Sequence, residues 1–145
     1  MTSVLCRRLP ILWCVPWCLL LAACGGDRVK VYPVRGGVFF RDRPAPGATV
    51  VFHPVASTDP KAPRPSGVVA ADGTFTLSTF ALDDGAPAGD YVVAIVWLTP
   101  APATATASAE RGNRLPQVYA DPKSSPLRAT VKEGPNVLDP FKLKS

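Results

Sequence analysis

The sequence predicts an all-β protein, an antiparallel β-sandwich of about seven strands that follows an N-terminal export signal. Three observations lead to this fold class. The 145 residues include 17 Pro and 11 Gly, which disfavour helix interiors and favour turns. From residue 29 onward, apolar and polar residues alternate with the period of a half-buried strand. The length suits one domain and excludes an enzyme with separate cofactor and substrate domains.

The first 23 residues have the layout of a signal peptide. Arg7 and Arg8 supply the positive charge at the start, and residues 9–23 contain no charged side chain. A membrane-spanning helix needs about 20 apolar residues. This run is shorter, and Pro10 and Pro16 interrupt it. We therefore expect residues 1–23 to be a cleaved secretory signal rather than a transmembrane anchor.

The end of this segment, Leu21-Ala22-Ala23-Cys24, resembles the lipobox of bacterial lipoproteins. The resemblance implies cleavage before Cys24, diacylglycerol on the Cys24 thiol, and further acylation with palmitate-type chains. Residues 24–28 would then be a lipidated tether that holds the domain to the cell envelope, outside the cytoplasm. Two or three acyl chains anchor a protein stably, whereas one chain holds it weakly. Gly25 stands where some sorting systems place a retention Asp, so an outer membrane is favoured over an inner one.

Signal cleavage changes what the composition means. Cys6, Cys14 and Cys18 leave with the signal, so the exported chain retains only Cys24 and forms no internal disulfide. The stability of the exported chain must therefore come from its hydrophobic core. Loss of Arg7 and Arg8 lowers the formal net charge from +5 to +3. This small excess and the extracytoplasmic address exclude nucleic acid as a partner.

Two hairpins are predicted in the first half of the domain. The first pairs Gly37–Arg41 with Ala48–His53 through a polar, Pro-rich connection. The second pairs Gly67–Ala71 with Thr74–Thr79 across Asp72-Gly73, which is a strong two-residue hairpin signal. In Thr74–Thr79 the apolar side chains should point inward and the hydroxyls outward.

Three more strands are predicted in the second half. Tyr91–Trp97 is apolar on both faces and rich in β-branched residues, as expected for a strand that is covered on both sides. Leu127–Lys132 and Phe141–Lys144 alternate, and Gly134-Pro135-Asn136 forms the turn between them. The predicted core consists of Phe52, Phe75, Leu77, Tyr91, Val93 and Ile95.

Residues 29–145 resemble a carboxypeptidase-regulatory-like domain, which is a transthyretin-like (prealbumin-like) seven-stranded β-sandwich. The resemblance depends on an ordered set of motifs: Pro33-Val34-x-Gly36, Ala48-x-Val50-x-Phe52, Asp72-Gly73-Thr74-Phe75-x-Leu77 and Gly89-x-Tyr91-x-Val93. Short bacterial envelope lipoproteins share further segments: Asp84-Gly85-Ala86-Pro87-Ala88-Gly89-Asp90-Tyr91, Leu115-Pro116-x-x-Tyr119, Ser125-Pro126-Leu127 and Gly134-Pro135-Asn136. This resemblance implies a fold and an address rather than an activity.

The residues that catalysis would need are sparse. His53 is the only histidine, no Gly-x-Ser-x-Gly elbow is present, and Cys24 is the expected lipid attachment site. We therefore expect no catalytic residue and no enzyme. The alternative is a small hydrolase that pairs His53 with a loop carboxylate such as Asp83, Asp84 or Asp121.

No cofactor is predicted, and metal ligands are few. Zinc needs three or four His, Cys or carboxylate ligands, which the sequence does not cluster. Asp83 and Asp84, with Asp90 nearby, are weak candidates for calcium, which prefers carboxylate and carbonyl oxygens. A calcium-dependent carbohydrate-binding module is therefore a second functional alternative.

The segment 99–126 interrupts the strand pattern and is predicted to be a long loop, with a low-complexity first part. Its second part allows two interpretations. Leu115, Val118 and Tyr119 could cover one end of the core, or Arg114, Tyr119 and Asp121 could border a binding surface.

The sequence favours a non-enzymatic, lipid-anchored envelope protein that serves as a structural, adhesive or binding module. Its partners would be membrane lipid through the acylated Cys24, and envelope proteins or glycans held against Tyr119 and Trp97. Basic residues from Arg28 to Arg43 are interpreted as solvated strand faces and turns rather than as contacts with lipid head groups.

Overall fold

The computed structural model describes residues 29–100 and 111–145, which form two β-sheets and one short helix. The predicted signal, the tether with Cys24 and most of the low-complexity segment lie outside these residues. Nine strands are present in the described ranges, where the sequence predicts about seven, and two of the nine are only two residues long. The elements are β1 (Val34–Phe40), β2 (Arg43–Pro44), β3 (Thr49–Pro54), β4 (Ser66–Val68), β5 (Thr74–Thr76), β6 (Gly89–Val96), α1 (Gln117–Ala120), β7 (Arg128–Val131), β8 (Asn136–Val137) and β9 (Phe141–Leu143).

The first sheet is built around β1, which pairs with four other strands. β2 and β5 pair with it in antiparallel fashion, with Phe40 opposite Arg43 and Gly36 opposite Phe75. β8 and β9 pair with it in parallel, with Val38 opposite Phe141. The sheet is therefore mixed, and the prediction of antiparallel pairing throughout is wrong for these two strands. Parallel pairing arises because the chain crosses from β7 in the other sheet before it returns along β1.

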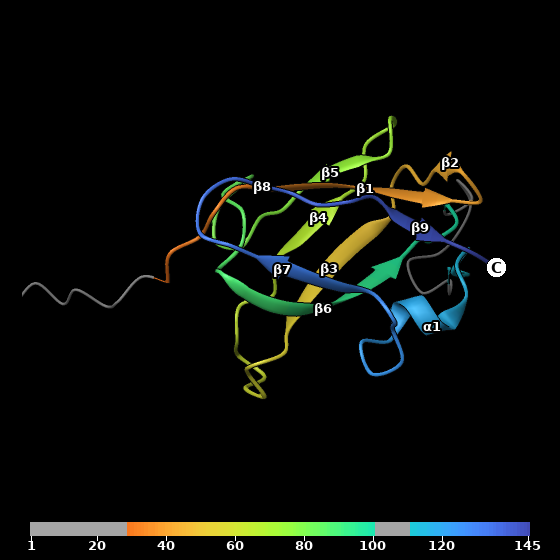
Figure 1. The fold of residues 1–145 in the computed structure, drawn as a ribbon. Helices are drawn as coiled ribbons and strands as arrows, with labels where there is room; N and C mark the ends of the chain where they lie inside the picture. The colour runs from red at the N-terminus through yellow and green to blue at the C-terminus, as the bar shows by residue number, and fades with distance from the viewer. Residues whose placement is uncertain (1–28, 101–110) are drawn as a thin grey trace, which may run out of the picture.

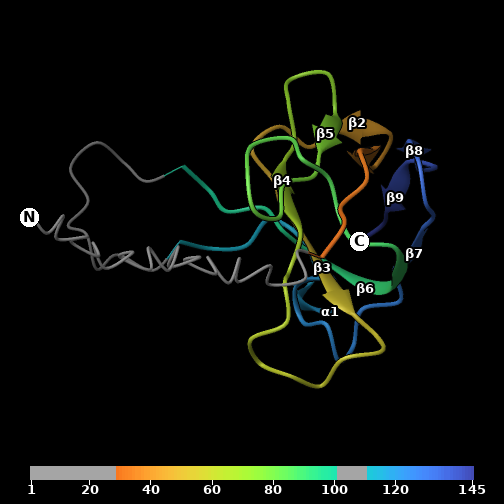
Figure 2. The same cartoon turned by 90° about the vertical axis from the view of Figure 1, so that its left-hand side faces the viewer.

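The second sheet has the strand order β4-β3-β6-β7 and is antiparallel throughout. β3 and β6 form its centre, with Phe52 opposite Val93. The two sheets form separate layers, one that contains β1 and one that contains β3 and β6 (Figures 1 and 2). The all-β class is confirmed by this arrangement.

The core lies between the two layers, and all six predicted core residues belong to it: Phe52, Phe75, Leu77, Tyr91, Val93 and Ile95. The alternation predicted for Thr74–Thr79 is confirmed, because Phe75 and Leu77 are buried and Thr74 is exposed. The Phe52 ring contacts both layers. Its centroid lies 6.4 Å from that of Phe75 and 5.5 Å from that of Tyr91.

The first predicted hairpin does not form as a two-stranded pair, whereas the second forms in part; both turns are present. Arg41 and Asp42 have φ values of 52° and 61°, the left-handed conformation of a tight two-residue turn. The chain therefore folds back at once as β2, and β3 joins the other sheet. Asp72-Gly73 turns as predicted, with Ala70 N–H donating to Thr74 O at 2.7 Å. The two arms meet again at the antiparallel bridge between Ser66 and Ser78, whose N–H groups donate to each other's carbonyl oxygens at 2.9 and 2.8 Å. On their other sides, β4 pairs with β3 and β5 pairs with β1.

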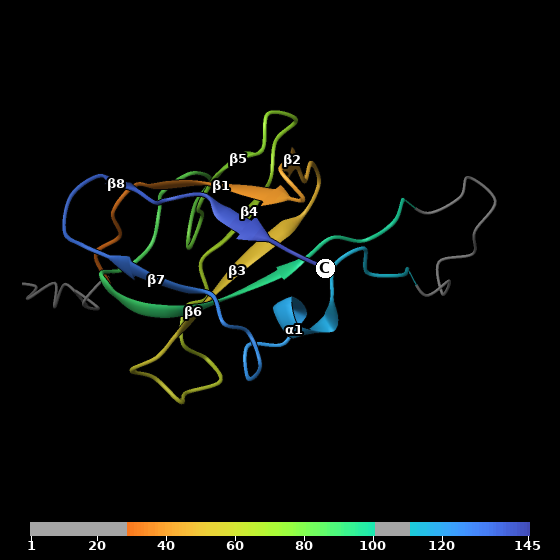
Figure 3. The same cartoon turned by 45° about the vertical axis from the view of Figure 1, so that its right-hand side comes forward.

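The segment after β6 folds back over the sandwich. Leu115 is buried in the core, and Tyr119 packs against it from α1. Ala94, on the opposite face of β6 from Val93 and Ile95, is only 4% exposed. Figure 3 shows α1 beside β6. At Ala94 this confirms the prediction that the central strand β6 is covered on both sides. Leu115 and Tyr119 cover the core as predicted. Val118 is 41% exposed, so the prediction is wrong for this residue.

The two ends of the sandwich differ in what they carry. The described chain enters at Val29, beside the start of β6 and the end of β3. β1 runs away from this entry point and ends beside β2, and the end of β6 and α1 lie at the same far end (Figure 1). Within residues 29–100 and 111–145, no helix has the length and apolar character needed to cross a bilayer.

Candidate functional site: an arginine–aromatic pocket

A short two-stranded extension of β6 positions Trp97 and Arg114. Arg114 N–H donates to Trp97 O at 2.7 Å, and Thr99 N–H donates to Gly112 O at 2.9 Å. Residues 97–99 thus pair with residues 112–114. Because paired residues on adjacent strands place their side chains on the same face, the Arg114 guanidinium lies over the Trp97 ring. Its carbon is 4.7 Å from the ring centroid.

Asn113 holds this extension in register. Its Oδ1 accepts N–H hydrogen bonds from Trp97 at 3.0 Å and from Leu115 at 3.2 Å. Leu115 is buried in the core, so the Asn113 amide joins the pocket to the rigid part of the fold. The Nδ2 atom of Asn113 is buried and has no hydrogen-bond partner in the described part of the chain.

The turn after β1 contributes the other wall. Phe40 ends β1, and its ring meets the Trp97 ring edge-on, with 6.3 Å between centroids and 76° between planes. The Arg41 guanidinium lies 5.2 Å from the Phe40 centroid, and its Nε donates to Ser145 Oγ at 3.2 Å. Arg43 follows on β2 and is exposed. The tight turn is what brings two arginines to one side of Trp97.

An open hollow of about 630 Å³ lies between these residues, and we call it the arginine–aromatic pocket. Its lining residues are Phe40, Arg41, Arg43, Pro44, Trp97 and Arg114. Trp97 and Arg114 also line a neighbouring hollow of about 320 Å³, to which Arg111 contributes. The Trp97 ring is fixed between the two because its Nε1–H donates to Pro46 O at 2.9 Å. No carboxylate of the described residues lines either hollow.

The pocket is suited chemically to an anion. A guanidinium that stacks on an aromatic ring is held by the cation–π attraction, and its N–H edge remains free to donate. Arg41 and Arg114 are both held in this way. The Nε of Arg41 already donates to Ser145 Oγ, so only the two terminal nitrogens of Arg41 face a ligand. Planar guanidinium groups bind carboxylate and phosphate oxygens through paired hydrogen bonds. Because the described residues place no carboxylate in the lining, none of them neutralises these positive charges from within the pocket.

Of the three residues predicted to border a binding surface, only Arg114 lies in this pocket. The Tyr119 hydroxyl accepts the N–H of Lys144 at 3.2 Å, and its ring packs against the core. The Asp121 carboxylate accepts the N–H of Lys123 at 2.9 Å within its own turn. The structure therefore does not bring Tyr119 and Asp121 together with Arg114 in one pocket.

His53 lies on β3 opposite Val92 and is half-buried. Burial lowers the pKa of the His53 ring, and the positive charge of Arg64 lowers that pKa further. The charge that acts on the ring is thus a cation, whereas a catalytic His needs a carboxylate partner to hold its proton. The structure provides no observation that favours the His53 hydrolase.

Two of the carboxylates considered for calcium already accept hydrogen bonds from neighbouring residues. The Asp84 carboxylate accepts the N–H groups of Thr79, Phe80 and Ala81 at 2.6–2.9 Å. Burial raises the Asp84 pKa, but the hydrogen bonds outweigh it and leave that pKa below its ordinary value. Asp90 instead accepts the Thr130 hydroxyl proton. Asp83, Asp84 and Asp90 form no joint site, and no group of three His, Cys, Asp or Glu residues suited to a metal exists among the residues described.

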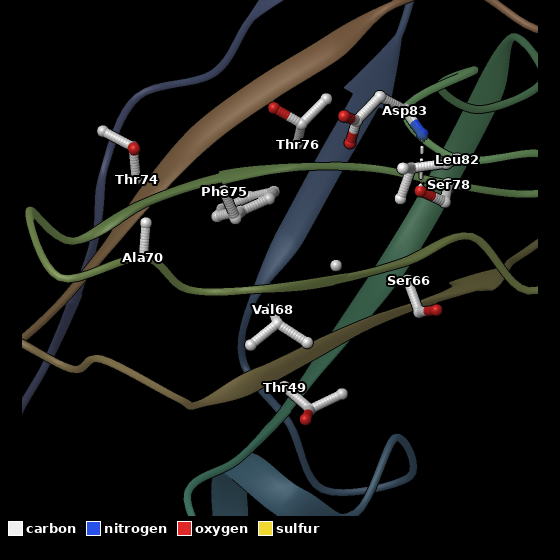
Figure 4. A pocket seen from close by; sticks show the side chains of 11 residues that line it. Thr49, Ser66, Val68, Ala70, Thr74, Phe75, Thr76, Ser78, Leu82 and Asp83 are labelled. Carbon is white, nitrogen blue, oxygen red and sulfur yellow. Dashed lines mark hydrogen bonds between the residues drawn. The ribbon is translucent and has the colours of Figure 1, made fainter.

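A third hollow, of about 430 Å³, lies beside β4 and β5 (Figure 4). Hydroxyl side chains and the exposed Leu82 line it, with Phe75 among them. Asp83 is its only charged lining residue, and the Asp83 N–H already donates to Ser78 Oγ at 2.8 Å. This hollow lacks the converging charges of the arginine–aromatic pocket.

Sequence reasoning identified Arg114 and Trp97 separately but missed the pocket that they share with Phe40, Arg41 and Arg43. The signal was the sequence Phe40-Arg41-Asp42-Arg43, in which a tight turn places two cations next to an aromatic residue. Its proximity to Trp97 depends on the packing of two different sheets, which no local pattern specifies.

Neither the family models nor the curated proteins with which the chain was compared match it. What can be proposed about function therefore depends on the residues of the chain, above all on the cations and aromatic rings of the pocket and on its place in the fold.

Proposed function

We propose that the protein is a non-enzymatic, lipid-anchored binding module of the cell envelope. The sequence Leu21-Ala22-Ala23-Cys24 supports export and lipidation at Cys24, with the outer membrane favoured by Gly25. A two-layer β-sandwich behind a short tether supports a module that presents a surface to a partner. The motifs shared with carboxypeptidase-regulatory-like domains support a transthyretin-like accessory fold of this kind.

This proposal depends mainly on the position of the arginine–aromatic pocket in the fold. The described chain begins at Val29, which lies beside Pro54 and the start of β6. The pocket residues Phe40 and Arg43 belong to the end of β1 and to β2, which lie at the opposite end of the sandwich from the start of β6 (Figure 1). β1 is seven residues long and spans the distance between the two ends, which is roughly 20 Å at about 3.3 Å per residue. Tether residues 24–28 would reach at most about 17 Å. An anchor at Cys24 would therefore hold the domain near the membrane with its pocket directed away from it.

Lipidation is tested by the mass of the amino-terminal peptide and by membrane fractionation of the full chain expressed in bacteria. We expect a mature protein that begins at an acylated Cys24 and sediments with the envelope. Cys24→Ser should abolish acylation, whereas the matched variant Cys18→Ser, within the signal, should leave both readouts unchanged. A purified protein that begins at Met1, or that carries an unmodified Cys24, would contradict the proposal.

Binding is tested by crosslinking in intact envelopes, followed by capture of the protein from detergent extracts. A binding or scaffolding module should yield a discrete crosslinked species in addition to the monomer. Recovery of monomer alone, at several crosslinker lengths, would count against a protein partner and leave a glycan or a small ligand as the occupant of the pocket.

A further inference from the structure

We propose that the arginine–aromatic pocket binds the phosphate group of a ligand that lies beyond the surface of the anchoring membrane. The phosphate assignment rests on the pocket alone. Only the direction in which the pocket faces rests on the proposed lipid anchor at Cys24.

The first argument is charge. Arg41, Arg43 and Arg114 converge on one hollow whose lining contains no carboxylate among the described residues. Like charges gathered in this way repel one another, and an anion in the hollow relieves the repulsion. A phosphate monoester carries a charge of about −1.5 to −2 at neutral pH, whereas a carboxylate carries −1. Three guanidinium groups therefore match a phosphate better than a carboxylate.

The second argument is preorganisation. Stacking on Trp97 and on Phe40 restricts the guanidinium groups of Arg114 and Arg41 before any ligand arrives. The Trp97 ring is itself fixed by its bond to Pro46 O, and the Arg114 backbone by its bond to Trp97 O. Binding to groups that are already ordered costs less side-chain entropy than binding to free arginines.

The third argument is size and surface. A hollow of about 630 Å³ exceeds the volume of a phosphate group and has room for the organic body to which the phosphate is attached. The Trp97 and Phe40 rings provide apolar surface beside the cations. A phosphate on a sugar ring and a phosphate in a lipid head group share this chemistry. The pocket lies at the end of the sandwich opposite to the start of β6, beside which the chain enters at Val29, and this position favours the sugar phosphate.

Trp97 supplies the readout. The chain has three Trp residues, and the other two, Trp13 and Trp17, lie in the predicted signal. The full-length protein, as processed by the expressing cell and purified in detergent, is titrated with glucose 6-phosphate at constant ionic strength while Trp emission is recorded. Glucose and acetate serve as controls for the sugar ring and for the negative charge. Trp97→Phe identifies the part of the emission that belongs to the pocket.

We expect saturable binding of glucose 6-phosphate and no saturation with glucose or acetate. Arg43→Gln and Arg114→Gln should each weaken the affinity about tenfold or more, because each removes a charge-assisted hydrogen bond. Arg35→Gln is the matched control, since it removes the same charge from an exposed position on the other half of β1. Thermal melting of each variant verifies that the fold is intact.

Three outcomes would overturn the inference. They are no saturable response of the wild type, equal weakening by Arg35→Gln, and saturation by acetate at the same concentration. Vesicles with and without phosphatidylglycerol decide whether the bound phosphate belongs to a sugar or to a lipid head group. Binding to phosphatidylglycerol vesicles without a response to glucose 6-phosphate would assign the site to a head group and overturn the membrane-distal ligand. An unmodified Cys24 would refute the anchor but leave the titration unaffected, so the two failures are distinguishable.

Discussion

Single residues decide the geometry of the pocket through the backbone rather than through their own contact with a ligand. Asn113 illustrates this, because its side-chain oxygen accepts the N–H groups of Trp97 and Leu115 and thereby sets the register of residues 112–114 against residues 97–99. The position of the Arg114 guanidinium follows from that register. A buried donor that finds no partner, as Asn113 Nδ2 finds none among residues 29–100 and 111–145, costs about 1–3 kcal/mol. The amide is thus held by its two accepted hydrogen bonds in spite of that cost.

His53 should make the stability of the fold depend on pH. Burial, and then the charge of Arg64, lowers the pKa of the His53 ring below its ordinary value, so the unfolded chain binds a proton more readily than the folded chain. The stability from the neutral ring is therefore fully present above the unfolded pKa and is lost as the pH falls through the folded pKa. We expect the urea midpoint of the wild type to fall between pH 7.5 and pH 5.

His53→Gln should remove most of this dependence, and Arg64→Gln should remove a smaller part, because burial is the larger cause. The carboxylates of Asp72 and Asp84 have lowered pKa values and titrate below this range. Equal pH dependence in the wild type and in His53→Gln, measured in urea over the same range, would show that the ring does not carry the effect.

At the scale of elements, the sequence predicted where the chain turns but not where each strand goes. Asp72-Gly73 is a local signal, and its turn forms. At Gly134 the chain bends and crosses from β7 in one sheet to β8 in the other. The partner of each strand is set by the packing of distant segments. The pairing of β1 with β8 and β9 joins residues about a hundred positions apart. The predicted pairing of Gly37–Arg41 with Ala48–His53 failed because two left-handed residues, Arg41 and Asp42, allow an earlier return as β2.

Burial was more predictable than pairing. Period-two alternation indicates which side chains face inward regardless of the sheet to which a strand belongs, so all six predicted core residues are buried. The pocket could not be predicted in the same way, because it joins the turn after β1 to the extension of β6. Arg114 was identified from its unusual loop, but Phe40 and Arg43 became part of the site only through the contact between the two layers.

Gly85 and Gly134 give a matched test of a turn and a close approach. Both have positive φ, 97° and 96°, so alanine is strained at either site. At Gly134 an added Cβ meets nothing within 4 Å, whereas at Gly85 it would overlap the carbonyl of Tyr32. Gly134→Ala should cost about 1 kcal/mol of unfolding free energy. Gly85→Ala should cost about 3 kcal/mol or more, because it also disrupts the paired hydrogen bonds between Tyr32 and Ala86.

Urea denaturation of the two variants measures the difference directly. Since the strain from φ is common to both, the excess cost of Gly85→Ala reports the steric clash and the loss of the Tyr32 bridge. Equal costs would mean that the chain near Tyr32 moves aside freely, and the bridge that joins the start of the described chain to residue 86 would then contribute little.

At the scale of the whole molecule, the core must hold two sheets together without covalent help. All four cysteines lie within the first 24 residues, so the described domain has no disulfide to constrain it. Each sheet has one hydrophobic face, and the two layers are stable only because these faces are buried against each other. Phe52 links them, because it belongs to β3 in one sheet and contacts Phe75 of β5 in the other.

Phe52→Ala should therefore destabilise both sheets in one transition. The side chain is fully buried, and loss of a buried Phe costs about 3–5 kcal/mol, which is a large fraction of the stability of a small domain. We expect the melting temperatures followed by far-UV circular dichroism and by Trp97 emission to fall together, since Trp97 lies at the far end of the same sandwich. Phe80→Ala, at a side chain 61% exposed, is the matched control and should change neither. A variant in which Trp97 emission melts separately from the sheet signal would show that the pocket end is stabilised independently, and the account of a single core that supports the pocket would be wrong.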